Sequence, residues 1–482
     1  MEIFRITVET VNQLSDKLLA FFQSYKLFFK LKTREVSRYA ETELKGAILM
    51  NHNRTYTEVS RKIISPLDDG QNLQHFMSDS PWETQPILDN IQHQIKETPQ
   101  LQGGMLNIDE SGDECSANKA GAQKQYLGRL GKVETGQVAV LSSYYKDNIW
   151  AMTDAKLFMP ESWFSEERKK QWERLHIPKD TIFKTKIEIA KDLIERAIKN
   201  ELPFVTVGAD TFYGRDSSFR DFVAKQNKIY MCNIPCDTMV YLNEPQISVP
   251  VKEPNTQGVA CKHERVIGQT EFKVRDLTSQ QVFHLIEVHN SERGKLIYNH
   301  AFLPVWTVRN VQRTDAQGNT YNGLYSVREL LVIRLENTCQ FSYAFTNAPM
   351  DTSKQQLSQW RSDRYFIERT NQDLKTEAGW DELRSSKYRA YMHRITIDAL
   401  ALWFIAKCKM DIRQNDQINN QKVKEQLGID TLPEISFANI RELLLTVYPL
   451  KTMSKEEAVV LVNKHLLNRS KSKKSKNKCL KI

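Results

Sequence analysis

The segment F-V-T-V-G-A-D, from Phe204 to Asp210, constrains the fold of this chain more than any other. It is apolar almost without interruption and then ends on a carboxylate. Such a run is typical of a central strand that is buried on both faces, as in a parallel sheet. Hydrophobic spacing predicts a helix over residues 186–199 before it, and a helix (217–226) and a strand (228–232) after it. The sequence therefore predicts a βαβ-like unit in which Asp210 ends the first strand.

Three short runs of strand type lie upstream of this unit. Residues 105–108 (M-L-N-I) lead directly into Asp109 and Glu110. Residues 137–143 and 149–153 are also of strand type, and a turn at 146–148 joins them. Neighbouring strands with such a short connection suggest a meander. A first carboxylate, Asp109, is therefore expected at the end of the first strand, as Asp210 is at the end of the fourth.

A late helix carries a third carboxylate. The segment W-R-S-D-R-Y-F-I-E-R-T-N-Q-D-L-K, residues 360–375, has no Pro or Gly and is predicted to be helical. At about 100° per residue, four polar side chains fall within roughly 60° of one another: Arg364, Glu368, Asn371 and Lys375. Such charges usually mark a solvated face with i,i+4 pairing, and that alternative stays open for the two cations.

Strand ends and a nearby helix can bring these three acids together, although 101 and 158 residues separate them along the chain. Three hard oxygen donors in one pocket suit Mg²⁺. Two such ions can activate water or a 3′-hydroxyl and stabilise the leaving oxygen of an in-line phosphoryl transfer. A buried carboxylate cluster without metal would be electrostatically costly, so the cluster implies the metal. Glu110 and Asp216 are the alternative candidates for these positions.

Both ends of the chain are predicted to be helical. Thr57 is the expected cap of a short helix to Ile63, and residues 80–83 (S-P-W-E) form a capping box for a helix to about Lys96. These N-terminal helices could bind DNA as a helix-turn-helix-like pair or brace the next domain. Helical spacing vanishes between residues 233 and 354, where a β-rich insertion of domain size is expected.

The C-terminal region is expected to end in a basic tail. An apolar helix is predicted over residues 388–408, and Ser436 and Ser454 are expected to start two short helices. From Arg469 to Lys481 there are seven cations and no acid, so the formal charge of +9 leaves about +2 for the rest of the chain. We expect a disordered extension that adds salt-dependent, sequence-independent affinity for DNA.

Composition excludes several classes of protein. An apolar content of 40% with 10% aromatic residues in 482 residues indicates a globular chain of several domains. The seven cysteines are scattered as in a reducing compartment, and no signal peptide or membrane span is visible. A soluble, cytoplasmic protein is expected. Cys232, Cys236 and Cys261-x-His263 are metal-binding residue types, but their spacing is unlike a zinc finger, so reduced thiols are expected.

Four segments together resemble the DDE transposases with a ribonuclease-H-like core, in particular the insertion-sequence 701 group, which is related to the insertion-sequence 4 group. I-D-E-S-G from Ile108 resembles the first family motif, apolar-D-D-T-G, and Q-K-Q-Y-L-G-R-L-G-K-V-E-T-G-Q-V from Gln123 resembles the stretch after it. A-D-T-F-Y-G from Ala209 resembles the second motif. R-Y-F-I-E, with a lysine seven residues after its glutamate, resembles the R-(3)-E-(6)-K signature. The resemblance covers most of the chain, but Arg361 stands where the wider signature has a tyrosine.

The resemblance implies a transposase that cleaves and joins DNA strands at the terminal inverted repeats of its transposon. Asp109, Asp210 and Glu368 would hold two Mg²⁺, for which Mn²⁺ could substitute, and Arg364 and Lys375 would contact DNA phosphates. Because two transposon ends need two active sites, a homodimer on double-stranded DNA is expected. The alternatives are a catalytically idle DNA-binding derivative that acts as a repressor, and a metal-dependent nuclease on the same core.

The fold implied by the resemblance is an α/β ribonuclease-H-like core interrupted by the β-rich insertion. Tyr213 and Trp360 could stack on a displaced base, with core packing the commoner role for such residues. The expected domains are an N-terminal helical, DNA-binding domain (1–100), a first core part (101–232), the insertion (233–354), a second core part with the Glu368 helix (355–410), and C-terminal helices with the basic tail (411–482).

Overall fold

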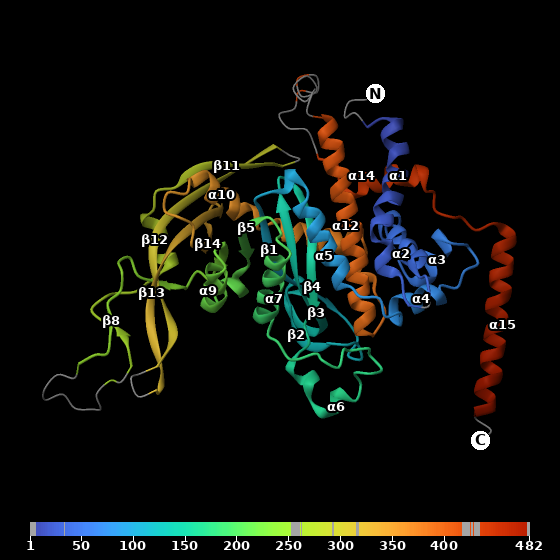
Figure 1. Cartoon of the computed structure of the whole chain (residues 1–482), viewed down its shortest axis with the longest axis horizontal. Coiled ribbons are helices and arrows are strands. Elements are labelled where there is room, and N and C mark those ends of the chain that lie inside the picture. The colour runs from blue at the N-terminus through green and yellow to red at the C-terminus, as the bar shows by residue number, and fades with distance from the viewer. Residues whose placement is uncertain are drawn as a thin grey trace.

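A large mixed sheet forms the centre of the molecule (Figure 1). The computed structural model describes residues 6–32, 34–251, 261, 263–291, 294–314, 318–416, 425, 428 and 434–479. The sheet has ten strands in the order β11-β12-β13-β14-β6-β5-β1-β3-β2, with β4 paired to β3. The N-terminal helices lie on one side of this sheet and the β12–β13 hairpin extends on the other (Figure 1). The predicted α/β class is confirmed at this level.

Five strands carry the predicted sequence pattern. The meander is confirmed, because β3 pairs antiparallel with both β1 and β4. The unbroken apolar run forms β5, which lies parallel to β1 on one side and to β6 on the other. The bounds are β1 (Gly104–Glu114), β2 (Gln123–Leu127), β3 (Lys132–Lys146), β4 (Ile149–Leu157), β5 (Phe204–Ala209) and β6 (Ile229–Ile234).

The helix before β5 forms over the predicted residues. Helix α7 (Lys186–Lys199) begins at a capping box of Thr185 and Glu188 and buries a stripe of apolar side chains. On the same helix, Arg196 pairs with the fully buried Asp154 of β4 at 2.7 Å. Two helices then join β5 to β6: α8 (Thr211–Gly214) and α9 (Ser217–Lys225).

The N-terminal region is helical, but two predicted helix starts are wrong. Thr55, rather than Thr57, caps α3. Helix α5 begins at Gln85 instead of at the box of residues 80–83, because Trp82 is buried and its ring stacks on His393 with centroids 3.6 Å apart. Tertiary packing therefore overrides the local capping signal. The helices are α1 (Val8–Tyr25), α2 (Ser37–Leu49), α3 (Tyr56–Ile63), α4 (Gln71–Ser78) and α5 (Gln85–Lys96).

The β-rich stretch continues the central sheet. Its last strand, β14, pairs antiparallel with β6, so no break in hydrogen bonding separates the two parts. The domain boundaries given above remain predictions. The strands of this stretch are β7 (Met239–Val240), β8 (Ile247–Ser248), β9 (Arg265–Val266), β10 (Phe272–Lys273), β11 (His284–Ser291), β12 (Gly294–Thr314), β13 (Thr320–Asn337) and β14 (Gln340–Thr346).

The prediction of one continuous helix over residues 360–375 is wrong, because the segment is divided among three consecutive elements. Helix α10 (Lys354–Asp363) ends before α11 (Phe366–Gln372), which runs into a π-helical turn, η6 (Asp373–Glu377). The Phe366 ring stacks on Tyr145 of β3, with centroids 3.8 Å apart. This packing against the sheet sets where α11 begins.

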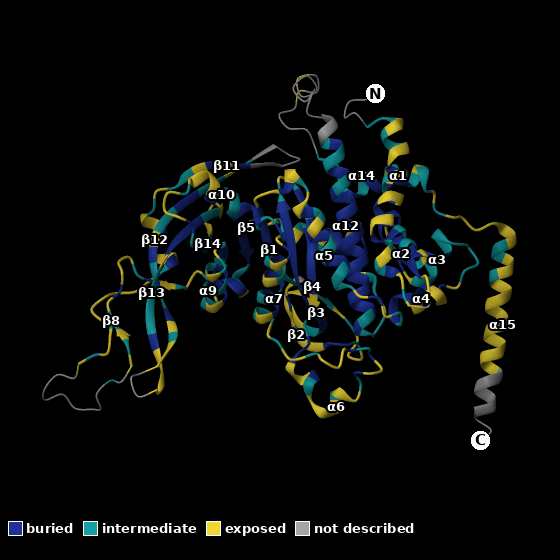
Figure 2. Ribbon diagram, in the orientation of Figure 1, coloured by how far each residue is buried: buried dark blue, intermediate teal, exposed yellow. Residues whose placement is uncertain are grey.

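The C-terminal helices close the fold. Helix α12 (Tyr388–Asp416) is buried along most of its length (Figure 2). Ser436 caps α14 (Phe437–Val447), as predicted, and Ser454 with Glu457 opens α15. The tail expected to be disordered is helical up to Cys479, because α15 spans Lys455–Cys479. Among the residues described, no helix combines the length and apolar content needed to cross a membrane.

Candidate active site

Two of the predicted acids stand side by side on adjacent parallel strands. Asp210 directly follows the end of β5, as predicted, but the expected strand end at Asp109 is wrong, because β1 continues to Glu114 in antiparallel pairing with β3. In the register of β1 and β5, Ile108 lies opposite Ala209. Each of these residues is followed by one of the acids, Asp109 and Asp210. Residues 101 positions apart in the sequence therefore meet on neighbouring strands within the sheet, where β5 ends.

Backbone N–H groups orient both carboxylates. Asp210 caps α8 and accepts hydrogen bonds from the N–H of Phe212 at 2.9 Å and of Tyr213 at 3.3 Å. Asp109 accepts from the N–H of Glu110 at 2.7 Å and from Asn371 Nδ2 at 3.4 Å. The second bond connects Asp109 to α11.

The third acid, Glu368, reaches the same place on α11. Thr370 fixes this helix against the sheet through a 2.6 Å hydrogen bond between its Oγ1 and Ser143 Oγ. Trp150 Nε1 donates to Asp373 Oδ2 at 3.0 Å, just beyond the end of α11. The Glu368 side chain is 50% exposed and accepts from Arg364 Nη2 at 2.7 Å. Its carboxylate is thus engaged by a cation on its own segment.

One cleft of about 830 Å³ contains all five residues predicted for the site. The acids Asp109, Asp210 and Glu368 line it together with Arg364 and Lys375. In the part of the chain that the structure describes, no three Asp, Glu, His or Cys side chains are grouped so that they could hold a metal ion. The structure therefore brings the acids into one cleft without closing them into a metal cage.

The electrostatics of the cleft favour a cation. Burial of the carboxyl group and the nearby Asp210 raise the pKa of Asp109 to about 8. Burial also raises the pKa of Asp210, against the hydrogen bond from Tyr213 N–H, and the Glu110 carboxylate adds to the increase. Two buried amide oxygens of the lining, Asn233 Oδ1 and Asn371 Oδ1, have no hydrogen-bond partner among the described residues. Hard oxygen donors with excess negative charge fit a divalent cation.

Lys375 lies deeper than a freely exposed phosphate-binding lysine. Its Nζ donates to the carbonyl of Gly112 at 3.2 Å and pairs with Asp113 at 2.9 Å. The π-helical turn places this side chain against β1. Arg364 is the cation that pairs with Glu368, so the two basic residues of the segment have different partners.

Four other residues that the sequence analysis considered do not line the cleft. Tyr213 is fully buried and Trp360 is packed at the edge of a hydrophobic cluster, so both serve core packing. Asp216 caps α9 by accepting from Phe219 N–H at 3.0 Å and does not line the cleft. Arg361 is 1% exposed and donates to Ser342 Oγ at 2.8 Å.

The structure adds residues to which the sequence assigned no role. Asn371 contacts Asp109, and its position three residues after Glu368 on the same helical face was the available signal. Glu110, which the sequence offered only as an alternative acid, lines the cleft and pairs with Lys186 of α7 at 2.9 Å. Two exposed aromatic side chains, Tyr126 and Phe212, also line the cleft.

Comparison with known proteins places this site in a family. The sequence model of the DDE superfamily endonucleases matches residues 26–290, which include Asp109 and Asp210. The chain is 31% identical over 208 residues to a protein of Microchaete diplosiphon named "Probable transposase for insertion sequence element IS701". That match covers 42% of this chain and 48% of the relative, so the chain spans about half of the relative's length. Because the family model covers more than half of the chain, the protein belongs to the DDE superfamily endonucleases.

Proposed function

We propose that the protein is a DNA transposase that cleaves and joins strands at the terminal inverted repeats of its transposon. One observation carries the proposal: acids from β1, from the end of β5 and from α11 line a single cleft with two basic residues. Membership of the DDE superfamily endonucleases and similarity to an IS701 transposase support the same function. Such an enzyme acts on nucleoid DNA.

The proposed core is ribonuclease-H-like, with residues 233–354 as its insertion. Supporting this, the antiparallel strands β4, β3 and β1 are followed in the sheet by β5 and β6, both parallel to β1. Asp210 then stands at the carboxyl end of β5, where α/β sheets commonly bind ligands, and Asp109 lies beside it on β1.

Asp109, Asp210 and Glu368 would hold two Mg²⁺ in this site, with Mn²⁺ as a substitute. When bound, these ions would activate the attacking water or 3′-hydroxyl and stabilise the leaving oxygen. The raised pKa of Asp109 falls when a cation replaces the proton. A metal ion held by Glu368 would compete with Arg364 for this carboxylate and so free the guanidinium for a DNA phosphate. Lys375 supports the cleft from its contact with β1.

Double-stranded DNA is the proposed partner, and two copies of the chain would pair two transposon ends. The N-terminal helices and the basic C-terminal end of α15 are the proposed additional contacts with the DNA. Their contribution would be electrostatic and salt-dependent.

The test compares two aspartates that each cap a helix: Asp210, which lines the cleft, and Asp216, which does not. Purified protein is incubated with Mg²⁺ and DNA that carries the element's own inverted repeats. Wild type should cleave and join these ends, and Asp210→Ala should lower the rate by roughly 10³-fold or more. Asp216→Ala, which removes only the cap of α9, should remain active. Unchanged cleavage by Asp210→Ala would sink the assignment.

A DNA-binding derivative without catalysis is the second candidate. The ion pair between Glu368 and Arg364 favours it, because the charge of the third acid is compensated within the chain. Such a repressor would bind the inverted repeats with a steep salt dependence and leave them uncut in Mg²⁺. Cleavage without strand joining would instead assign a metal-dependent nuclease on the same core.

A further inference from the structure

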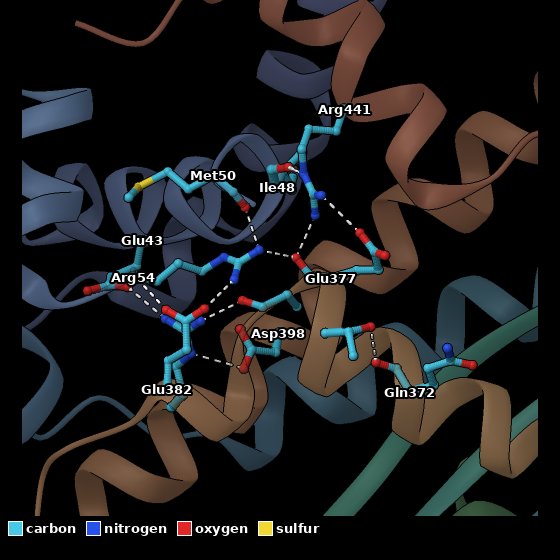
Figure 3. A network of polar contacts seen from close by, with 12 residues as sticks. Glu43, Ile48, Met50, Arg54, Gln372, Glu377, Glu382, Asp398 and Arg441 are labelled. Atoms are coloured by element: carbon cyan, nitrogen blue, oxygen red, sulfur yellow. Dashed lines mark hydrogen bonds and ion pairs between the residues drawn. The ribbon is translucent and has the colours of Figure 1, made fainter. Parts of the chain in front are cut away.

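The far end of the Glu368 segment is held by three arginines. The turn η6 ends at Glu377 and Ala378, where backbone carbonyls lack partners within the helix and carry partial negative charge. Arg54 and Arg441 both donate to the carbonyl of Glu377, the latter at 2.6 Å (Figure 3). Arg394 Nη2 donates to the carbonyl of Ala378 at 2.6 Å. We call Arg54, Arg394 and Arg441 the arginine clamp.

Two members of the clamp connect this end to other helices. Arg54 follows α2 and also binds the carbonyl of Met50 and Glu382 Oε1, the latter at 2.8 Å. Arg441 of α14 donates to the carbonyl of Ile48 at 2.8 Å and pairs with the Glu377 carboxylate at 2.9 Å. The end of α2, the start of α14 and the end of η6 are therefore joined through two guanidinium groups (Figure 3).

The third member is anchored by buried acids. Arg394 of α12 pairs with Asp398 at 3.0 Å and with Glu43 of α2 at 3.4 Å. Both carboxylates are fully buried, so water cannot replace a lost partner. These two ion pairs fix the position of the Arg394 guanidinium.

Gly379 allows the clamp to close on the chain. Its φ is +86°, a backbone conformation that residues other than glycine rarely adopt. A Cβ at this position would lie 2.6 Å from both Cδ and Nη1 of Arg54. The backbone after η6 is thus shaped to receive the Arg54 side chain.

The clamp sits at the opposite end of the segment from the active-site acid. Glu377 follows Glu368 by nine residues, and between them Lys375 binds β1. We propose that the arginine clamp positions Glu368 relative to Asp109 and Asp210, so that the N-terminal helical region forms part of the active-site framework. This inference rests on the proposed role of Glu368 as the third acid.

The test uses full-length protein with Arg54→Lys and Arg441→Lys, which keep the charge but lose the guanidinium fork. Arg196→Lys is the matched control, because Arg196 pairs with a buried aspartate away from α11. Glu382→Gln, which alters a partly exposed partner of Arg54, is a milder second variant should the lysine variants not fold. The readouts are amide hydrogen exchange over residues 366–377, Mn²⁺ affinity by electron paramagnetic resonance, and cleavage kinetics on end DNA.

The clamp variants should exchange these amides about tenfold faster than wild type and bind Mn²⁺ roughly tenfold more weakly. Their kcat should fall by about tenfold or more while KM for end DNA stays within about twofold. Arg196→Lys should lower the melting temperature without these changes. Glu382→Gln should change amide exchange, Mn²⁺ affinity and kcat in the same directions, but by smaller amounts.

A purely structural network would lower only the melting temperature. Exchange and Mn²⁺ affinity in the clamp variants that match those of Arg196→Lys would overturn the inference. Absence of cleavage by wild type, with exchange and Mn²⁺ affinity still responding to the clamp, would instead reject the proposed function and keep the positioning role.

Discussion

Asp109 lines the cleft and Glu329 of β13 lies in the interior, and the surroundings of these two carboxylates are opposite. Glu329 is fully buried, and Arg220 Nε, Arg309 Nη2 and Thr307 Oγ1 lie 3.0, 2.9 and 2.6 Å from its oxygens. Burial acts to raise the pKa of Glu329, but the two guanidinium groups outweigh it and hold the pKa below its usual value. At Asp109, burial and another aspartate raise the pKa to about 8.

The difference separates a structural acid from a functional one. The charge of Glu329 is compensated within the chain, and the network joins β12 and β13 to α9. The charge of Asp109 is not compensated, and its neighbourhood is a cleft that can admit a cation. An uncompensated carboxylate in a cleft indicates a binding site, whereas a compensated one indicates structural pairing. Four predictions test this contrast.

The largest effect is expected at Asp109. Asp109→Asn should reduce Mg²⁺-dependent cleavage by roughly 10³-fold or more, because it would remove one of the three proposed metal ligands. In chelator, the same variant should melt about 2 °C higher than wild type, because the repulsion by Asp210 is gone. Cleavage assays and thermal unfolding measure the two effects. A less stable variant with normal cleavage would place Asp109 with the structural acids.

Glu329 should show the reverse behaviour. Glu329→Gln leaves Arg220 and Arg309 buried without a counter-charge and should lower the free energy of unfolding by about 3–5 kcal/mol. Urea denaturation measures this loss. Cleavage by the folded fraction should stay within about twofold of wild type, since the residue does not line the cleft. A loss of stability below about 1 kcal/mol would show that the pairing matters little.

The pH dependence of stability should also distinguish the two acids. The pKa of Asp109 is about 8 in the folded chain and about 4 in the unfolded chain. The folded state therefore binds more protons between these values, so this group's contribution is complete below about pH 4 and is lost as pH rises through about 8. In chelator, the melting temperature of wild type relative to Asp109→Asn should fall between pH 5 and 8. Mg²⁺ should stabilise wild type more at pH 8 than at pH 5, because binding requires the deprotonated acid. A difference independent of pH would contradict the raised pKa.

The sequence predicted the part of the site that depends on regular strands. The apolar run before Asp210 forms β5 and ends before this carboxylate, as predicted, and parallel pairing with β1 brings Asp109 beside it. The predicted strand end at Asp109 is wrong, because pairing with β3 carries β1 on to Glu114. Periodicity also located α7 correctly. These features depend on local pattern and repeated backbone geometry, so the sequence alone could predict them.

Tertiary contacts determine the parts that the sequence could not predict. A uniform helical period over residues 360–375 could not reveal the break at Phe366 or the π-helical turn, which follow from packing on Tyr145 and Trp150. The arginine clamp has no sequence signal, because Arg54 and Arg441 are single arginines that are 387 residues apart. Likewise, the 3.4 Å contact of Asn371 with Asp109 requires the fold before it can be recognised.

The smallest effect tests whether Arg364 belongs to the DNA interface or only to Glu368. Arg364→Ala removes the cation that holds Glu368 at 2.7 Å. If this guanidinium also contacts one phosphate, the slope of log K for end DNA against log salt should become shallower by about 0.9, with a modest loss of affinity at low salt. Fluorescence anisotropy over a salt series without divalent metal measures the slope independently of cleavage. An unchanged slope would show that Arg364 does not contact a phosphate. Like Arg220 and Arg309, it would then serve only to pair with a carboxylate of its own chain.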